Sequence, residues 1–197
     1  MAYLTAAVVL IGAVSVLNLV LMLGVVKRLR GAEAEAPGLV GEPGPRPVLP
    51  PGERPEPFSV TSREGVLFEP AGGTGRLVGF FTPHCNLCHD RMPKFLKYAR
   101  GAGLDRDQVF AVLVGSPEET AALAAELAPV AGVVDEPDGG GSVYEAFGVR
   151  GLPAMYLLDA DGVILSSGTD LAGFPDPERY AAKIRSGAAR TTAGARR

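Results

Sequence analysis

The chain has 197 residues, enough for one domain of ordinary size with appendages, and its formal net charge of −3 gives no reason to expect a nucleic-acid partner. It contains only two cysteines, and a bond between Cys85 and Cys88 would close almost no loop. Charge and cysteine usage therefore argue against a nucleic-acid binder and against a disulfide-stapled scaffold. Catalytic chemistry or metal binding therefore remains as the explanation for the two closely spaced cysteines.

The chain begins with an apolar segment, Leu4–Val26, that carries no formal charge. As a helix this segment would run roughly 35 Å, enough to cross a hydrocarbon core of about 30 Å. No Lys or Arg precedes it, and it is too long for the apolar region of a typical cleaved signal peptide. It predicts an uncleaved, single membrane-spanning helix, with residues 1–30 as the anchor.

The sequence does not fix the side of the membrane on which the rest of the chain lies. Lys27, Arg28 and Arg30 follow the apolar segment directly, which by the positive-inside rule favours the cytoplasm. A tethered pair of redox cysteines is more useful outside the cytoplasm, where disulfides persist. We expect a single-pass protein of the cell membrane whose cysteine-bearing domain lies outside the cytoplasm, although the two arguments conflict.

Residues 31–57 are dense in Pro and Gly, and predict an extended linker. A folded domain is expected over 58–187, with a disordered basic tail over 188–197. A short hairpin is expected in Phe58–Phe68. Short apolar runs predict strands over Arg76–Thr82, Gln108–Gly115, Gly132–Asp135, Ala154–Leu158 and Val163–Ser167. Helices are predicted over Cys85–Arg100, from Ser116 to about Leu127, and over Ser142–Phe147 and Asp176–Ile184.

Strands that alternate with helices predict an α/β domain in which helices cover both faces of a sheet. The turn at Asp161–Gly162 predicts a hairpin that adds antiparallel strands at the end of the domain. The expected architecture is therefore a three-layer sandwich with a mixed central sheet.

The two cysteines lie where a buried strand passes through a turn into a helix. The first turn of a helix has unpaired N–H groups and the positive end of the macrodipole, and both favour a thiolate over a thiol. The thiolate is the species that attacks disulfides. The pattern indicates thiol–disulfide exchange, with Cys85 as the nucleophile and Cys88, one turn on, as the resolving thiol. His84 precedes Cys85 and is interpreted equally as an imidazolium that stabilises the thiolate or as a solvent-facing turn residue.

Two segments resemble the thioredoxin superfamily, in particular its TlpA/ResA/MauD group of bacterial membrane-anchored thiol–disulfide oxidoreductases. They are Phe80–Cys88, which carries the CxxC motif, and Gly151-Leu152-Pro153 before an apolar strand. The resemblance covers roughly residues 40–186. It implies a thioredoxin-like fold, no cofactor, protein thiols or disulfides as partners, and a redox partner that resets the cysteine pair.

The resemblance also implies roles for single residues. Pro153 matches the position of the family's cis-proline, whose loop lies against the CxxC motif and helps to bind extended substrate. Leu152, Pro83 and His84 would then flank the cysteines. Pro93 resembles the proline that bends the active-site helix of thioredoxins.

The sequence departs from the family pattern at two positions. His84 stands where a Trp commonly precedes the first cysteine. Gly79 stands near the position of a buried acidic residue, so a different proton acceptor, or a water, is needed. The direction of electron flow, the physiological substrate and the oligomeric state are left open.

Three other functions compete with this interpretation. Cys85–His89 matches the C-x-x-C-H attachment site of c-type haem, with Met92 or Met155 as the second axial ligand. Thr82, three residues before Cys85, partly resembles a peroxiredoxin site, but Val78 replaces the usual proline. A non-enzymatic tether is the third. A metal site is not expected, because one helical turn rarely directs four adjacent ligands at one centre.

Overall fold

The computed structural model describes residues 48–184 together with Gly12 and Ser15, both of which are helical. The predicted membrane helix Leu4–Val26, apart from those two residues, lies outside the described part, as do most of the predicted linker and the tail. Within the described ranges, no helix is both long enough and apolar enough to cross a bilayer. The chain divides into the units Met1–Gly44 and Pro45–Arg197, and all described strands belong to the second.

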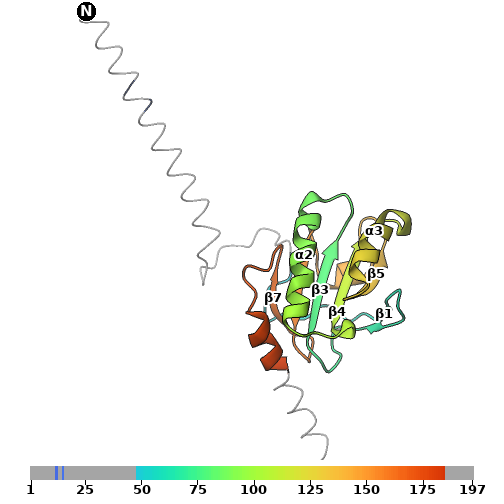
Figure 1. The fold of residues 1–197 in the computed structure, drawn as a ribbon, viewed down its shortest axis with the longest axis vertical. Coiled ribbons are helices and arrows are strands. Elements are labelled where there is room, and N and C mark those ends of the chain that lie inside the picture. Colours follow the sequence, from blue (N-terminus) through green and yellow to red (C-terminus); the bar gives the residue numbers. More distant parts are fainter. Residues whose placement is uncertain (1–11, 13–14, 16–47, 185–197) are drawn as a thin grey trace, which may run out of the picture. The chain divides into compact units, whose positions relative to one another are not determined.

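The centre of the domain is a five-stranded sheet with the strand order β5-β4-β3-β6-β7 (Figure 1). The strands are β3 (Arg76–Phe81), β4 (Val109–Val114), β5 (Gly132–Glu136), β6 (Ala154–Leu158) and β7 (Ile164–Gly168). β4 runs parallel to β3 and β5, whereas β6 runs antiparallel to β3 and β7. The predicted mixed sheet and its final antiparallel hairpin are confirmed.

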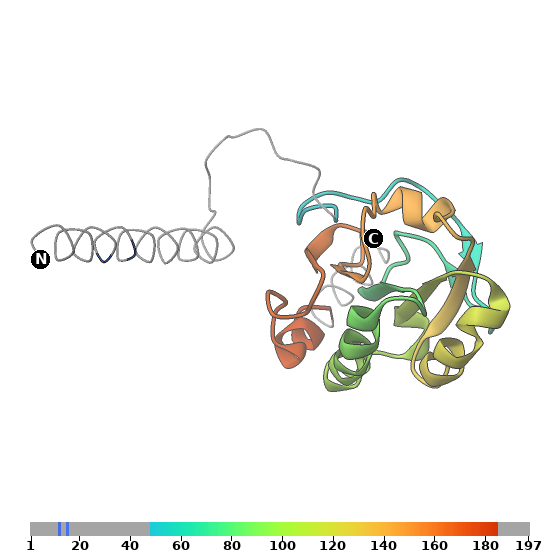
Figure 2. The same cartoon turned by 90° about the horizontal axis from the view of Figure 1, so that it is seen from above.

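Helices cover both faces of this sheet. They are α2 (Asn86–Gly101), α3 (Pro117–Leu127), α4 (Ser142–Ala146), the short 3-10 helix η1 (Arg106–Gln108) and a helix over residues 177–184. α2, α3 and the helix over 177–184 bury their apolar side chains in one core cluster, and α4 buries its own in another. The first three helices lie on one face of the sheet and α4 lies on the other (Figure 2). Because β3 has a core on each side, every one of its residues is buried. The predicted three-layer sandwich is confirmed.

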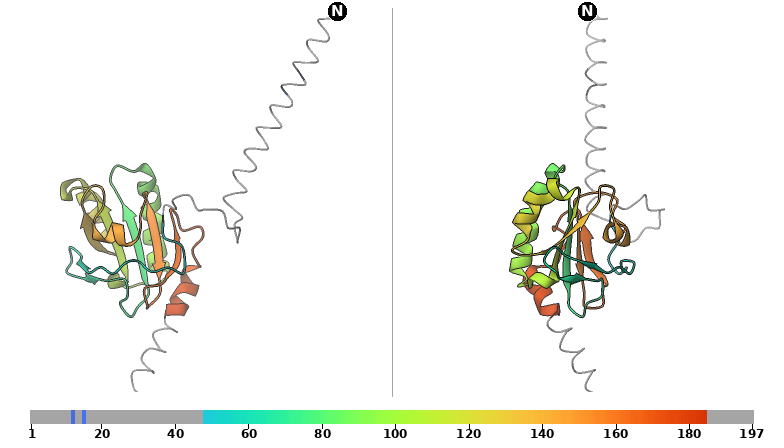
Figure 3. Two further views of the ribbon diagram at one scale, coloured as in Figure 1. Left: turned by 180° about the vertical axis from the view of Figure 1, so that it is seen from behind. Right: turned by 90° about the vertical axis from the view of Figure 1, so that its right-hand side faces the viewer.

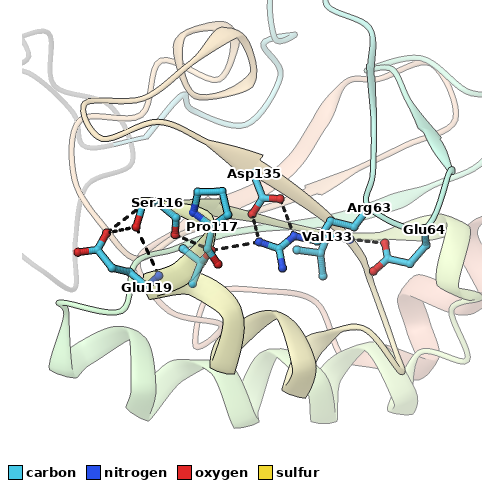
Figure 4. A network of polar contacts seen from close by, with 8 residues as sticks. Arg63, Glu64, Ser116, Pro117, Glu119, Val133 and Asp135 are labelled. Atoms are coloured by element: carbon cyan, nitrogen blue, oxygen red, sulfur yellow. Dashed lines mark hydrogen bonds and ion pairs between the residues drawn. The ribbon is translucent and has the colours of Figure 1, made fainter.

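A small hairpin covers the outer edge of β5. Its strands β1 (Val60–Thr61) and β2 (Leu67–Phe68) pair antiparallel, as expected for this region. The loop between them places the Arg63 N–H 2.7 Å from the Val133 carbonyl, and the Glu64 carboxylate accepts the Val133 N–H at 2.8 Å. The Arg63 guanidinium also donates to both Asp135 carboxylate oxygens (Figure 4). Backbone and charged contacts together therefore attach the hairpin to the edge strand.

The last ten residues of the predicted linker, 48–57, lie along the domain. The Gly52 N–H donates to the Ile164 carbonyl at 2.8 Å, and the Ile164 N–H donates to the Glu53 carbonyl at 2.9 Å. The Ser167 hydroxyl donates to the Leu49 carbonyl. An edge strand offers unpaired backbone groups, and an extended proline-rich segment can satisfy them. The ordered domain therefore begins before Phe58.

Candidate active site

Cys85 lies directly before α2 and is the residue that caps it. Its backbone is extended (φ −116°, ψ 108°), and its Sγ accepts the N–H of Cys88 at 3.2 Å, as a serine or aspartate oxygen would at a helix start. The Cys85 carbonyl accepts the same N–H at 3.0 Å. The sulfur therefore lies among the unpaired N–H groups of the first turn, an arrangement that stabilises negative charge.

Cys88 lies one turn further along α2 and is fully buried, whereas Cys85 is half-buried. Burial and, second to it, the contact with Cys85 raise the pKa of the Cys88 thiol to about 12, although a backbone hydrogen bond from Thr82 acts in the opposite direction. Both thiols are free. The site thus has one accessible sulfur and one protonated sulfur behind it, which matches the roles of attacking and resolving cysteine.

This difference predicts selective alkylation. At pH 8, iodoacetamide is expected to modify Cys85 of the reduced protein while Cys88 stays unmodified, because a raised pKa keeps the Cys88 thiol protonated and burial excludes the reagent. Tandem mass spectrometry of the peptide that contains both cysteines measures this directly. The same reaction in denaturant should modify both residues, and equal modification in the folded protein would contradict the assignment.

The segment before β6 brings Leu152 and Pro153 close to Cys85. The Leu152–Pro153 peptide bond is cis, as the resemblance implied, and the Cys85 thiol is 3.7 Å from the Leu152 carbonyl oxygen. β6 pairs with β3, the strand that leads into Cys85, so the sheet itself places these distant residues together. The Leu152 carbonyl therefore lies beside the Cys85 sulfur and accepts its S–H.

The two histidines of the chain both hold the turn that precedes Cys85. His84 Nε2 lies 3.3 Å from Glu119 Oε1 at the surface, and His89 Nε2–H donates to the Pro83 carbonyl at 3.1 Å. Hydrogen bonds from Ser116 lower the pKa of Glu119, and the charge of His84 acts in the same direction. Sequence reasoning placed a helix start at Ser116 but missed Glu119 as the partner of His84, because His84 and Glu119 belong to different elements.

The space beneath Gly79 is filled by aromatic rings. A Cβ atom added at Gly79 would lie 2.6 Å from the Phe81 ring and 2.7 Å from the Phe95 ring. The structure therefore explains why the sequence has no acidic residue at this position: a carboxylate side chain would collide with the Phe81 and Phe95 rings. Cys88 is surrounded by apolar side chains, and the groups that interact with its sulfur are Cys85 and the backbone of Thr82.

The contacts of the haem-ligand candidates argue against the c-type haem alternative. Met92 and Met155 are both buried in the core cluster beneath α2, and the His89 ring is turned back to the Pro83 carbonyl. Recruiting any of them as an axial ligand would require the core or the turn to open. Within residues 48–184, no three His, Cys, Asp or Glu side chains are grouped so that they could hold a metal ion.

Several solved structures are similar to this chain. A protein of Neisseria meningitidis assigned as a thioredoxin matches with a TM-score of 0.50 and 24% identity, over 68% of this chain and 88% of that chain. A secreted Mycobacterium tuberculosis disulfide oxidoreductase homologous to E. coli DsbE has 15% identity over 66% and 95% of the two chains. A thio-disulfide isomerase from Thermus thermophilus has 16% identity over 64% and 89%, and the last two have TM-scores of 0.48.

Comparison with protein-family models found no match, and comparison with curated protein sequences found none either. The described domain has the thioredoxin-like fold, as its sheet order and the likeness to the Neisseria protein show.

Proposed function

We propose that this protein is a thiol–disulfide oxidoreductase that exchanges disulfides with partner proteins. The observation that carries the proposal is the position of the two sulfurs. Cys85 Sγ is accessible at the start of α2 and accepts a backbone N–H, while Cys88 is buried one turn behind it. A thioredoxin-like fold is the scaffold on which this chemistry commonly occurs, which supports the proposal by analogy only.

The reaction proceeds in two exchange steps. The Cys85 thiolate attacks one sulfur of a partner disulfide, forming a mixed disulfide and releasing the other partner sulfur as a thiolate. Cys88 then loses its proton and attacks Cys85 Sγ. This step forms the Cys85–Cys88 disulfide and releases the second partner sulfur. Two electrons pass to the partner, and the reverse sequence oxidises it.

The proton of Cys88 must leave before the second step. Its pKa is raised to about 12, and no carboxylate fits at Gly79 to accept the proton. The released partner thiolate lies near the mixed disulfide when it forms and can accept this proton, but the transfer is unfavourable because an ordinary cysteine has a pKa of only about 8.5. We therefore expect the resolving step to be slow relative to the first, so that the mixed disulfide persists long enough to be isolated.

The location and partners extend this proposal. Leu4–Val26 is proposed to anchor the chain in the cell membrane as a single span, with the redox domain outside the cytoplasm. Partners would be protein disulfides or thiols, including apo-cytochromes or metalloenzymes during maturation, and a second redox protein would reset the pair. Leu87, which is 42% exposed beside the cysteines, offers apolar contact to such partners.

Trapping the intermediate tests the proposed function. A Cys88→Ala variant expressed in cells is expected to accumulate mixed disulfides on Cys85, because the resolving thiol is gone. A matched Cys85→Ala/Cys88→Ala variant should trap nothing. Absence of any adduct on Cys85 under reducing and oxidising growth would overturn the proposal, and peroxide consumption that survives Cys88→Ala would favour the peroxidase alternative instead.

A further inference from the structure

Positive charge is concentrated at one end of a domain that is acidic as a whole. Residues 48–184 contain eleven Lys and Arg against nineteen Asp and Glu, a net charge of −8. Five of those eleven cations lie on the second half of α2 or on the helix over 177–184, namely Lys94, Lys97, Arg100, Arg179 and Lys183. Asp176 and Glu178 lie beside them, so this end has a local excess of three positive charges.

The two helices lie side by side at this end, opposite the connection between β3 and α2 (Figures 1 and 3). A groove of about 570 Å³ lies between α2 and the segment that leads into the second helix, lined by Lys94, Lys97, Tyr98, Arg100, Gly101, Leu171 and Pro177. Its three cations are exposed and follow one another at intervals of three residues, so they share one face of α2. We call Lys94, Lys97 and Arg100 the basic row.

The basic row lacks acidic partners. Among the described residues, no carboxylate lies within ion-pair distance of any of its three cations, whereas Arg63, Arg91 and Arg106 are each paired with a carboxylate. A single exposed lysine often has no ion-pair partner. Three unpaired cations beside an apolar groove, in a domain that is acidic as a whole, favour an anionic ligand.

The floor of the groove is fixed in place. The Tyr98 hydroxyl donates to the Pro175 carbonyl at 2.8 Å, and the Tyr98 ring meets the Phe174 ring edge-on at 6.0 Å. These contacts attach the loop before the helix over 177–184 to α2. The groove is therefore formed before a ligand binds, and binding requires no free energy to open it.

We propose that the basic row binds the anionic headgroups of phospholipids in the bilayer to which the chain is anchored. The inference rests on the proposed anchor, which keeps the domain near a lipid surface and so raises its effective concentration there. Charge complementarity favours this occupant, since phosphate groups provide the negative charge and the glycerol carbons can contact the apolar floor. Cys85 lies at the other end of α2, roughly 14 to 22 Å from the basic row along the helix axis. Binding would therefore direct the reactive sulfur away from the bilayer, toward soluble partners.

Amine footprinting of the full chain tests the contact. The chain is inserted into nanodiscs of phosphatidylcholine alone or of a mixture with phosphatidylglycerol, and acetylation of Lys94 and Lys97 is followed by mass spectrometry. We expect acetylation of both lysines to fall at least about threefold with the anionic lipid, and to recover at about 0.5 M NaCl, because salt screens exposed charges. Equal acetylation in the two lipids, or failure of the chain to enter nanodiscs, would overturn the proposal.

A pair of variants provides the matched control. Lys94→Gln/Lys97→Gln removes two charges of the basic row, and Arg54→Gln/Arg150→Gln removes two exposed charges elsewhere on the domain. Hydrogen exchange at the last turns of α2 should slow with anionic lipid in the parent chain and in the arginine variant, but not in the lysine variant. Protection that arises only on adding an acidic protein would contradict the lipid assignment.

These measurements separate the inference from the proposed chemistry. The lysine variant leaves Cys85 and Cys88 untouched, so it should reduce soluble disulfides at the parent rate. Loss of lipid binding with intact exchange, and intact lipid binding in a Cys85→Ala variant, are the expected outcomes. If the lipid effect is absent while the mixed disulfides still form, only the membrane contact is wrong.

Discussion

Replacing Cys85 with serine is expected to lower the rate of disulfide reduction by at least about a thousandfold. The remaining thiol cannot substitute, because Cys88 is fully buried and its pKa is raised to about 12. At pH 7 a thiol with that pKa is thiolate in about one molecule in 10⁵. A serine hydroxyl is not a nucleophile toward disulfides under these conditions. Reduction of insulin disulfides in the presence of dithiothreitol measures the loss.

The control for this prediction is Cys88→Ser. That variant keeps the attacking sulfur and its place at the start of α2, so it should still form mixed disulfides rapidly while failing to turn over. If Cys85→Ser retained more than about a tenth of the parent rate, Cys88 would have to be accessible, and the roles assigned to the two sulfurs would be reversed.

Replacing Gly79 with aspartate is expected to lower the free energy of unfolding by at least about 4 kcal/mol. The new Cβ would lie 2.6 Å from the Phe81 ring and 2.7 Å from the Phe95 ring, so the rings must move. Overpacking of this kind costs about 1–3 kcal/mol, and the buried carboxyl group adds its own desolvation cost. Urea denaturation followed by circular dichroism measures the change.

Gly79→Ala separates the two contributions, since it adds the clash without the charge. It should cost about 1–3 kcal/mol, and shortening the neighbouring ring with Phe95→Leu in the same chain should recover part of that loss. A Gly79→Asp variant as stable as the parent would show that the site has room for an acid, and would contradict our account of the Cys88 proton.

Much of the domain could be predicted because its elements carry local signals. The apolar runs of β3 and β4 are bounded by turns, and Ser116 and Pro117 mark the start of α3 by a cap and a first-turn proline. The place of the two cysteines at a helix start could be predicted for the same reason, since a strand, a turn and a helix start are all local patterns. Pro153 required the family resemblance, because nothing in its own segment points to Cys85.

Contacts between distant segments could not be predicted. The pairing of His84 with Glu119 depends on how closely α2 and α3 start together, which no local pattern reveals. The filling of the space at Gly79 depends on the rotamer of Phe95, one helix away. Residues 50–53 have the composition of a linker, and only the open edge of β7 explains why they are ordered.

Both outer strands of the sheet already have neighbours, and this limits how another protein can be recognised. The loop at Arg63 is hydrogen-bonded to the outer edge of β5, and the segment around Gly52 is hydrogen-bonded to the outer edge of β7. A visiting polypeptide therefore cannot extend the sheet at these places by adding a strand, which is a common way of holding a peptide firmly. The contact area of a bound partner is then limited to the surface around Cys85. Under the proposed function, recognition would then depend little on the partner's sequence, so that one domain could exchange disulfides with several different proteins.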